Sequence, residues 1–208
     1  MKRWDLLNYL IQTRGYQSYL EIGCDRDATF RRIAIGDKVG VDPARGGTWR
    51  GTSDEFFAQN TRRFDLIFVD GDHDAEQAWR DVGNALDARA PAGCVVCHDA
   101  LPRSERQTRG KGDWRGNWTG EVWKVIAGLS ARPTIDTAVG DFDFGCAVIL
   151  DRPNGTPLES TVPWQALSWD DYRTRRDDLL RVMSWEDLRT WLTWRGGLTS
   201  APCRVAGR

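Results

Sequence analysis

The sequence has no apolar run long enough to cross a membrane. Its formal net charge is only −1 over 208 residues, which gives no electrostatic reason to expect a nucleic-acid or membrane partner. A secretory leader is not expected either, because Asp5 and Asn8 interrupt the apolar stretch near the N-terminus. We therefore expect a cytoplasmic protein of one-domain length with neither kind of partner.

Cysteine is present in an odd number, five, which does not suit a disulfide framework. Cys94 and Cys97 form a CxxC pair, a spacing also found in redox and zinc sites. Both lie inside a predicted buried strand, where positions three apart point to opposite faces, and no second pair completes a zinc site. We expect them to be small core thiols in a reducing compartment.

Two nucleotide-binding fingerprints are also missing. Neither G-x-G-x-x-G nor G-x-x-x-x-G-K-[ST] occurs, which disfavours NAD and ATP as ligands. The chain does have Gly23 after an apolar run and Asp42 at the end of the next one. Such a glycine lets a ligand approach the backbone, and such an acid can bind a ribose diol. The pattern favours a nucleoside ligand without phosphates.

Three strong apolar runs end in acidic residues. Glu21 lies at the end of the first, Asp70–His73 follow the second, and His98–Asp99 follow the third. Ligands of open α/β sheets bind outside the carboxyl ends of the strands. We therefore expect these three strand ends to form one site.

Apolar runs and helical spacings alternate along the chain, which predicts an α/β fold, a Rossmann-like three-layer sandwich with a mostly parallel sheet. The expected strands are Tyr16–Ile22, Lys38–Asp42, Leu66–Asp70, a run from Cys94, Thr134–Val139 and Phe144–Leu150. The expected helices lie around Trp4–Ile11, Thr29–Ala34, Ser53–Phe57, Ala75–Leu86 and Trp118–Leu129. The four residues between the last two strands permit only an antiparallel pair.

The alternation stops past Pro153. We expect residues 1–150 to form the Rossmann-like domain and residues 151–208 to form a helical extension packed on it. Ser168 and Ser184 each precede an acid by three residues, a variant of the capping box that predicts two helices. Several of the eleven tryptophans lie in this region, which makes it a candidate helix-packing or homodimer surface.

Residues 101–117 are rich in arginine and glycine and almost free of aliphatic side chains. They are expected to form a long loop directly after an acidic strand end. Such a loop is either a binding loop or lid, or an ordinary surface loop.

Several segments together resemble class I S-adenosylmethionine-dependent methyltransferases. They are Tyr-Leu-Glu-Ile-Gly at 19–23, Val-Gly-Val-Asp-Pro at 39–43, Gly-Thr-Ser-Asp-Glu-Phe-Phe at 51–57 and Phe-Val-Asp-Gly-Asp-His at 68–73. Pro-Ala-Gly-Cys-Val-Val-Cys-His-Asp at 91–99 is similar, more narrowly, to the bacterial methyltransferase domain family 24. The resemblance covers roughly residues 16–150. It implies a seven-stranded sheet whose last strand is antiparallel.

The resemblance also implies S-adenosylmethionine as cofactor and gives roles to individual residues. Glu21 and Gly23 would line the methionine part, Asp42 would hold the ribose, and Asp70 would lie beside the cofactor. The adenine would lie near Thr52, Ser53 and Asp54, although Ser53 and Asp54 also suit a helix N-terminus. Asp27 departs from the family, which usually has a glycine at that place.

The chemistry is expected at the second and third acidic strand ends. A small hydroxylated acceptor has to lose a proton on methylation, and Asp72, His73 and His98 are the catalytic candidates. Some relatives bind a divalent cation here, so Asp70, His98 and Asp99 are candidate ligands for Mg²⁺. Helix capping by Asp72 and a structural role for either histidine are the plain alternatives.

The resulting hypothesis is an O-methyltransferase that acts on a small hydroxylated molecule such as a sugar or a secondary metabolite. Two alternatives stay open. One is a metal-dependent hydrolase with Asp70, His73, His98 and Asp99 as ligands. The other is a non-catalytic relative that binds the cofactor or a partner.

Overall fold

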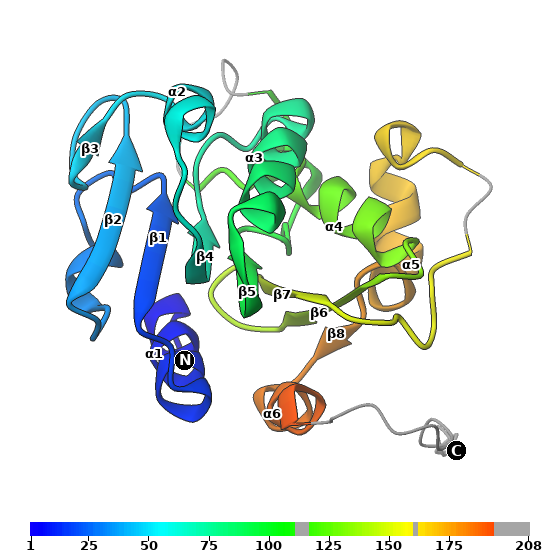
Figure 1. Cartoon of the computed structure of the whole chain (residues 1–208). Coiled ribbons are helices and arrows are strands. Elements are labelled where there is room, and N and C mark those ends of the chain that lie inside the picture. Colours follow the sequence, from blue (N-terminus) through cyan, green and yellow to red (C-terminus); the bar gives the residue numbers. More distant parts are fainter. Residues whose placement is uncertain (111–116, 160–161, 194–208) are drawn as a thin grey trace.

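The computed structural model describes residues 1–110, 117–159 and 162–193. Their strands form one sheet in the order β3-β2-β1-β4-β5-β7-β6-β8 (Figure 1). The strands are β1 (Ser18–Ile22), β2 (Asp37–Asp42), β3 (Trp49–Arg50), β4 (Phe64–Val69), β5 (Arg89–Cys97), β6 (Ile135–Gly140), β7 (Cys146–Asp151) and β8 (Val182–Met183).

All pairings in the sheet are parallel except those of β7, which runs antiparallel to both β5 and β6. The seventh strand therefore has the direction that the sequence predicts. The six strands located by sequence pattern are all present. The sequence pattern did not locate β3 and β8, because a strand of two residues is too short to show alternation.

Helices cover both faces of the sheet and make the three expected layers (Figure 1). One apolar cluster joins the sheet to α2 (Ser53–Gln59), α3 (Ala75–Asp87), α4 (Val122–Ser130) and α5 (Trp169–Leu180). A second cluster on the opposite face joins it to α1 (Arg3–Arg14) and α6 (Trp185–Thr193). Cys94 belongs to the second cluster and Cys97 to the first, so the two thiols point to opposite faces, as predicted.

The helix predicted over Thr29–Ala34 is wrong. Only a 3₁₀ turn, η1 (Phe30–Arg32), forms there, and Ala34 is exposed. Side chains take the hydrogen bonds that a helix would use: Lys38 donates to the carbonyls of Phe30 and Ile33 at 2.8 and 3.1 Å. Asn8 of α1 accepts from the Ala34 N–H at 2.9 Å. Packing against α1 and β2 thus replaces the local helix.

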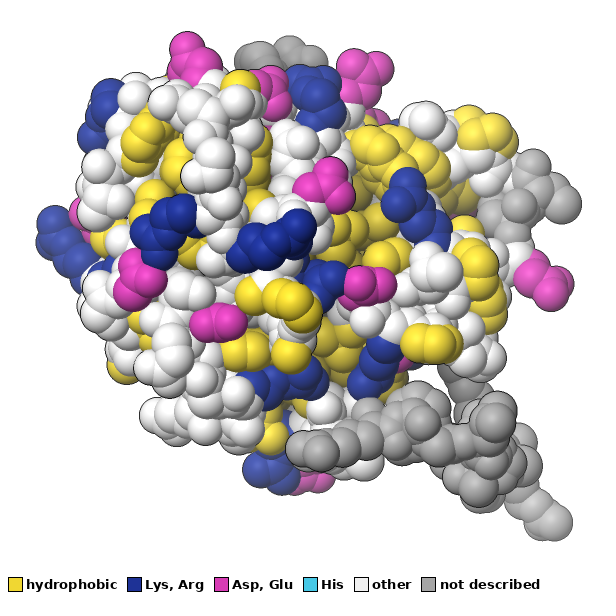
Figure 2. Space-filling model, viewed as in Figure 1, with side chains coloured by type: hydrophobic (Ala, Val, Ile, Leu, Met, Phe, Trp, Pro, Cys, Tyr) yellow, Lys and Arg dark blue, Asp and Glu magenta, His cyan; other side chains and the backbone are white. Residues whose placement is uncertain are grey.

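The described residues after 151 pack on the same sheet. The strand β8 pairs with β6, and α5 and α6 lie on opposite faces. The described tryptophans of this region make contacts within the chain: Trp164 stacks on Trp79 at 4.5 Å, and Trp185 meets Tyr9 at 5.0 Å. Figure 2 shows apolar side chains gathered over α3 and α4 among scattered cations. In the described part of the chain no helix is long and apolar enough to span a membrane.

Gly23 provides a test of how the strand ends fit together. Its φ is +86°, and a Cβ there would lie 2.1 Å from the carbonyl oxygen of Asp70. Gly15 has a similar φ of +68° with nothing within 4 Å of its Cβ position. We expect Gly15→Ala to lower the free energy of unfolding by about 1 kcal/mol and Gly23→Ala by at least about 3 kcal/mol. Urea unfolding measures both, and equal losses would contradict the close approach.

Candidate functional site

The acidic ends of β4 and β5 come together as predicted. The two strands are parallel neighbours with Val69 opposite Cys97, so the residues that follow them share one edge of the sheet. Four of these residues converge, and we call them the strand-end cluster: Asp70, His73, His98 and Asp99.

Two carboxylate oxygens and two imidazole nitrogens face one another in the cluster. His98 Nδ1 lies 3.3 Å from Asp70 Oδ1 and 3.2 Å from Asp99 Oδ2. His73 Nε2 lies 3.6 and 3.4 Å from the same two oxygens. The side chains of all four are at least 85% shielded from solvent. One oxygen from each acid therefore faces one nitrogen from each histidine.

The remaining polar atoms of three of these side chains are held by other parts of the chain. His73 Nδ1 donates to the backbone carbonyl of Trp118 at 2.8 Å. His98 Nε2 donates to the backbone carbonyl of Asp143 at 2.5 Å. Asp70 Oδ2 accepts from the guanidinium of Arg3 at 2.7 Å. These contacts fix the orientation of each ring and of the Asp70 carboxylate.

Charge coupling shifts the pKa values in the cluster. Burial raises the pKa of Asp70. The positive charge of His98, hydrogen bonds from both histidines and the charge of Arg3 act in the opposite direction. Together they outweigh burial and hold that pKa well below its usual range. Burial lowers the pKa of His98, but Asp70 and Asp99 more than compensate and raise it to about 10. The pKa of His73 is raised for the same reason. The two carboxylates therefore favour the protonated form of both imidazole rings.

Sequence pattern missed Arg3, Lys2 and Asp143. Asp143 lies in the turn between β6 and β7, and it binds Arg3 Nε and Lys2 Nζ at 3.0 Å each. These contacts, with burial opposing them, lower its pKa to about 2. The three residues come from the two ends of the predicted domain, 140 positions apart. Nothing in the local sequence signals that pairing, because only the folded sheet brings α1 to this turn.

Glu21 does not face the cluster with a free carboxylate. It is buried with 1% of its surface exposed, and Tyr19 two residues earlier donates a hydrogen bond to its Oε2 at 2.5 Å. Burial raises its pKa to about 8, although the bond from Tyr19 opposes the shift. Gly23 follows at the strand end, where its N–H donates to the Val41 carbonyl at 2.9 Å.

Asp42 holds the loops of its own chain. Its Oδ2 accepts from the Asp25 N–H, and its Oδ1 accepts from the N–H groups of Ala44 and Arg45, all at 2.8 Å. Burial raises its pKa, but these three bonds and Arg50 lower it further than burial raises it. A carboxylate offers about four lone pairs, so one is left for a ligand. In this conformation Asp42 could accept only one hydrogen bond from a ribose diol, and not one from each hydroxyl.

Asp27 keeps the backbone shape that a glycine would give. Its φ is +60°, in the left-handed region that favours glycine. Its Oδ1 accepts from the Gly47 N–H at 2.7 Å, and Arg31 lies 3.7 Å from its Oδ2. The side chain thus closes the loop after β1 onto the loop after β2.

The three residues proposed to lie near adenine begin α2. Thr52, and not Ser53, is the N-cap: its hydroxyl accepts from the Glu55 N–H at 3.2 Å, and Glu55 reaches back to the Thr52 N–H. The hydroxyl of Ser53 and the carboxylate of Asp54 both face Gln77 of α3, at 3.3 and 3.4 Å.

Asp72 lies half-buried in the loop between β4 and α3. Its Oδ1 accepts from the Asp74 N–H at 3.1 Å. The N-cap of α3 is Asp74, whose side chain makes no capping bond. The helix-capping alternative for Asp72 is therefore wrong, and the residue forms a local turn next to His73.

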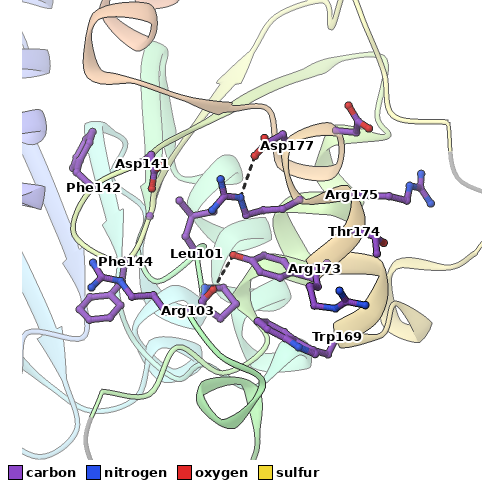
Figure 3. A pocket seen from close by; sticks show the side chains of 15 residues that line it. Leu101, Arg103, Asp141, Phe142, Phe144, Trp169, Arg173, Thr174, Arg175 and Asp177 are labelled. Carbon is purple, nitrogen blue, oxygen red and sulfur yellow. Dashed lines mark hydrogen bonds and ion pairs between the residues drawn. The ribbon is translucent and has the colours of Figure 1, made fainter.

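A cavity of about 750 Å³ is lined in part by residues that follow Asp99 and Asp143 in the sequence (Figure 3). It is bordered by the start of the predicted long loop, by the β6–β7 turn and by α5. Leu101 follows Asp99 by two positions and Phe144 follows Asp143 directly, and both line the cavity. Arg103 lies 4.6 Å above the ring of Phe144, while Trp169 borders the opposite side (Figure 3). Of the predicted loop, residues 111–116 lie outside the described part of the chain.

Comparison with known proteins identifies the fold. Residues 16–100 match the family model Methyltransf_24, described as a methyltransferase domain. No curated protein matches the sequence. Among solved structures, a putative caffeoyl-CoA O-methyltransferase from Staphylococcus aureus is similar, with a TM-score of 0.54 and 18% identity, over 71% of this chain and 82% of that one.

Two further structures were solved with S-adenosylhomocysteine (SAH). The methyltransferase PaMTH1 of Podospora anserina has a TM-score of 0.52 and 19% identity, over 73% of this chain and 77% of its own. The O-methyltransferase from Bacillus cereus has a TM-score of 0.50 and 15% identity, over 72% and 80%. At these identities the likeness shows the fold.

The buried carboxyl of Glu21 gives a pH prediction. The folded chain keeps this proton up to a pKa of about 8, whereas the unfolded chain releases it near 4.5. Stability contributed by this group is therefore present at low pH and is lost as pH rises between these values. Relative to Glu21→Gln, the wild type should lose up to about 1.4 kcal/mol of unfolding free energy per pH unit in that window. Urea unfolding at several pH values measures the difference, with exposed Glu76→Gln as control. Parallel curves for wild type and Glu21→Gln would contradict it.

Proposed function

We propose that this chain, whose residues 16–100 match the family model of a methyltransferase domain, transfers a methyl group from S-adenosylmethionine to a hydroxyl of a small acceptor. The match to the family model carries this proposal. The solved O-methyltransferases named above, one of them with bound SAH, support it. The hydrolase alternative finds no support in these comparisons and is not favoured.

The cofactor would bind at the carboxyl ends of β1, β2 and β4. Gly23 has no side chain, and a Cβ at this position would collide with the backbone of Asp70. The backbones of β1 and β4 are therefore not covered by a side chain of residue 23 at this edge. Asp42 has one lone pair to offer a ribose hydroxyl. We propose Glu21 for the wall of the methionine part and Thr52, Ser53 and Asp54 for the adenine end, with Asp70 on the side of the reacting methyl group.

The strand-end cluster suits a divalent cation. Ligand atoms of Asp70, His73 and Asp99 all lie within 4.8 Å of one another, which one ion can bridge. His98 Nδ1 faces the same oxygens. A bound cation would lower the pKa of an acceptor hydroxyl and hold its oxygen in line with the sulfonium. Mg²⁺ held by Asp70, His98 and Asp99 is the simplest form of this proposal.

The acceptor must also give up a proton, and we propose Asp72 as its base. The two histidines each use one ring nitrogen on a backbone carbonyl and turn the other toward Asp70 and Asp99. Asp72 lies one residue before His73 and is partly open to solvent. A carboxylate next to a cation-activated hydroxyl needs only to carry the proton to water.

The acceptor itself would occupy the cavity between the β6–β7 turn and α5. Aromatic side chains of Phe144 and Trp169 can cover the faces of a flat or ring-shaped molecule. Arg103 and Asp141 at its rim can bind hydroxyl or carboxylate groups. These residues support a small polar ring compound, a class that includes sugars and hydroxylated secondary metabolites.

Calorimetry with SAH tests the cofactor assignment. We expect the wild type to bind it and Asp42→Ala to bind about 10- to 100-fold more weakly, the loss of a hydrogen bond to a charged group. Asp37→Ala, at the other end of the same strand β2, should bind as the wild type does. Urea unfolding of both variants separates a lost contact from a collapsed loop. No heat from concentrated wild-type protein would overturn the proposed function.

A further inference from the structure

We infer that the cavity lined by Arg103 and Phe144 takes an acceptor whose hydroxylated ring carries a carboxylate or a phosphate group, and that Arg103 binds this anionic group. Calling the ligand a methyl acceptor rests on the proposed function, whereas the charge of the ligand follows from the cavity itself. Neutral sugars and neutral phenols are then poor ligands.

The cavity is lined by segments at the edge of the sheet where β4 and β5 end. The strand β6 runs in the direction of β5, because β7 is antiparallel to both, so the β6–β7 turn lies at that same edge. Backbone bonds join this turn to the segment after β5. Leu101 N–H donates to the Phe144 carbonyl at 2.7 Å, and Ala100 N–H donates to the Gly145 carbonyl at 3.3 Å. A ligand in the cavity therefore contacts the edge at which the cofactor is proposed to bind.

Arg103 brings a positive charge to this wall of the cavity. Its guanidinium lies 4.6 Å from the centre of the Phe144 ring, and its backbone N–H donates to the side-chain oxygen of buried Gln107 at 2.6 Å. Among the residues that the structure describes, no acid pairs with this guanidinium. Contact with a ring face does not use the N–H donors of a guanidinium, and their fork matches a carboxylate or a phosphate. Arg103 is therefore a fixed cation with donors to offer.

The other charged groups of the cavity do not neutralise Arg103. Arg176 donates to Asp177 at 3.0 Å, so these two lining charges offset each other. Figure 3 shows Asp141 and Asp177 on the side of the cavity away from Arg103. The remaining charged lining residues are exposed side chains of α5, namely Arg173, Arg175 and Asp178. The end of the cavity at Phe144 therefore has an unbalanced positive charge.

The backbone holds Phe144 in a conformation that bulky residues rarely adopt. Its φ is +64°, and that of Asp143 before it is +49°, both in the left-handed region. Gly145 follows, and a Cβ there would lie 2.6 Å from the side chain of Leu101. Strained backbone of this kind persists where the surrounding structure fixes it, and it is concentrated at ligand sites. The fixed turn presents the ring of Phe144 together with the guanidinium of Arg103.

A second aromatic surface borders the same cavity. Trp169 stacks on Tyr172 at 5.0 Å, and the Tyr172 hydroxyl donates to the Pro102 carbonyl at 2.9 Å, next to Arg103 in the chain. Figure 3 shows Trp169 well apart from Phe144. Aromatic side chains bind the faces of flat molecules. Two separate aromatic surfaces and one unbalanced cation suit a ring with an anionic substituent.

Probes that differ in charge but hardly in shape test the site. 4-Hydroxybenzoate and 4-hydroxybenzamide form such a pair, and phenyl phosphate carries the other candidate anion. Each is titrated into wild-type protein with SAH present, and binding is measured by saturation-transfer NMR. We expect the tighter anion to bind at least about tenfold better than the amide, and this preference to fall as salt is raised. That anion identifies the group as carboxylate or phosphate. Equal affinity for the amide, or no binding of either anion, would overturn the inference.

Variants locate the positive charge. Arg103→Gln should remove the preference for the anion and leave the affinity for 4-hydroxybenzamide unchanged, because only the charge is lost. Arg106→Gln is the matched control, since it removes an equal charge three positions along, outside the cavity lining, and it should keep the preference. Urea unfolding checks that both variants fold. A preference that survives in Arg103→Gln, or that is lost equally in Arg106→Gln, would contradict the role of Arg103.

The ring surface has its own variant. Phe144→Leu keeps a bulky side chain at the strained position but removes the aromatic face. It should weaken 4-hydroxybenzoate and 4-hydroxybenzamide by the same factor, in contrast to Arg103→Gln. Unchanged affinity for both probes would show that the ring does not cover the ligand and would reject this site.

The outcome is distinguishable from that of the proposed function. Heat with SAH in a chain that shows no preference for anions would overturn the anionic acceptor and leave the methyltransferase proposal standing. A preference that depends on Arg103 in a chain that gives no heat with SAH would overturn the methyltransferase proposal and leave an anion-binding cavity.

Discussion

The carboxylate of Asp70 is the group on which the site depends. It ends a buried strand, 85% of its side chain is shielded, and a charge in that position is tolerated only with close partners. The partners come from three parts of the chain: Arg3 from α1, His73 from the loop after β4, and His98 from the end of β5. Arg3 in turn needs Asp143 from the β6–β7 turn. The groups that compensate the charge of Asp70 therefore come from α1 and from both halves of the sheet, and their contacts hold these parts together at one edge.

The two sides of this edge are built differently. On the side of β4 and β5, two acids and two histidines face one another, and His98 Nδ1 lies 3.3 and 3.2 Å from the two carboxylates. On the side of β1 and β2, the carboxylates of Asp42 and Asp27 accept hydrogen bonds from backbone N–H groups of neighbouring loops. The first side is held together by pairing between opposite charges, and the second is held in shape by hydrogen bonds between its own loops. Preformed loops reduce the ordering cost of binding.

Prediction from sequence worked where a pattern repeats over many residues and failed where packing overrides it. Runs such as Leu66–Asp70 are long enough to mark strands. The segment Thr29–Ala34 has helical spacing, but Lys38 and Asn8 from neighbouring elements take its hydrogen bonds, so it forms a single 3₁₀ turn. The N-cap of α2 fell one residue earlier than predicted, since Thr52 and Ser53 are chemically almost interchangeable as caps.

The amino-acid pattern was enough to predict six of the eight strands in their chain order, the direction of β7, and the acids and histidines at two neighbouring strand ends. The position of these residues can be predicted because residues that follow two adjacent parallel strands lie at the same edge of the sheet. Which atoms meet depends on the folded chain. It turned both histidines toward the same two oxygens, directed Asp42 to its own backbone, and brought Arg3 to Asp70 and Asp143. Those contacts join residues up to 140 positions apart, and long-range packing, which leaves no local pattern, sets their geometry.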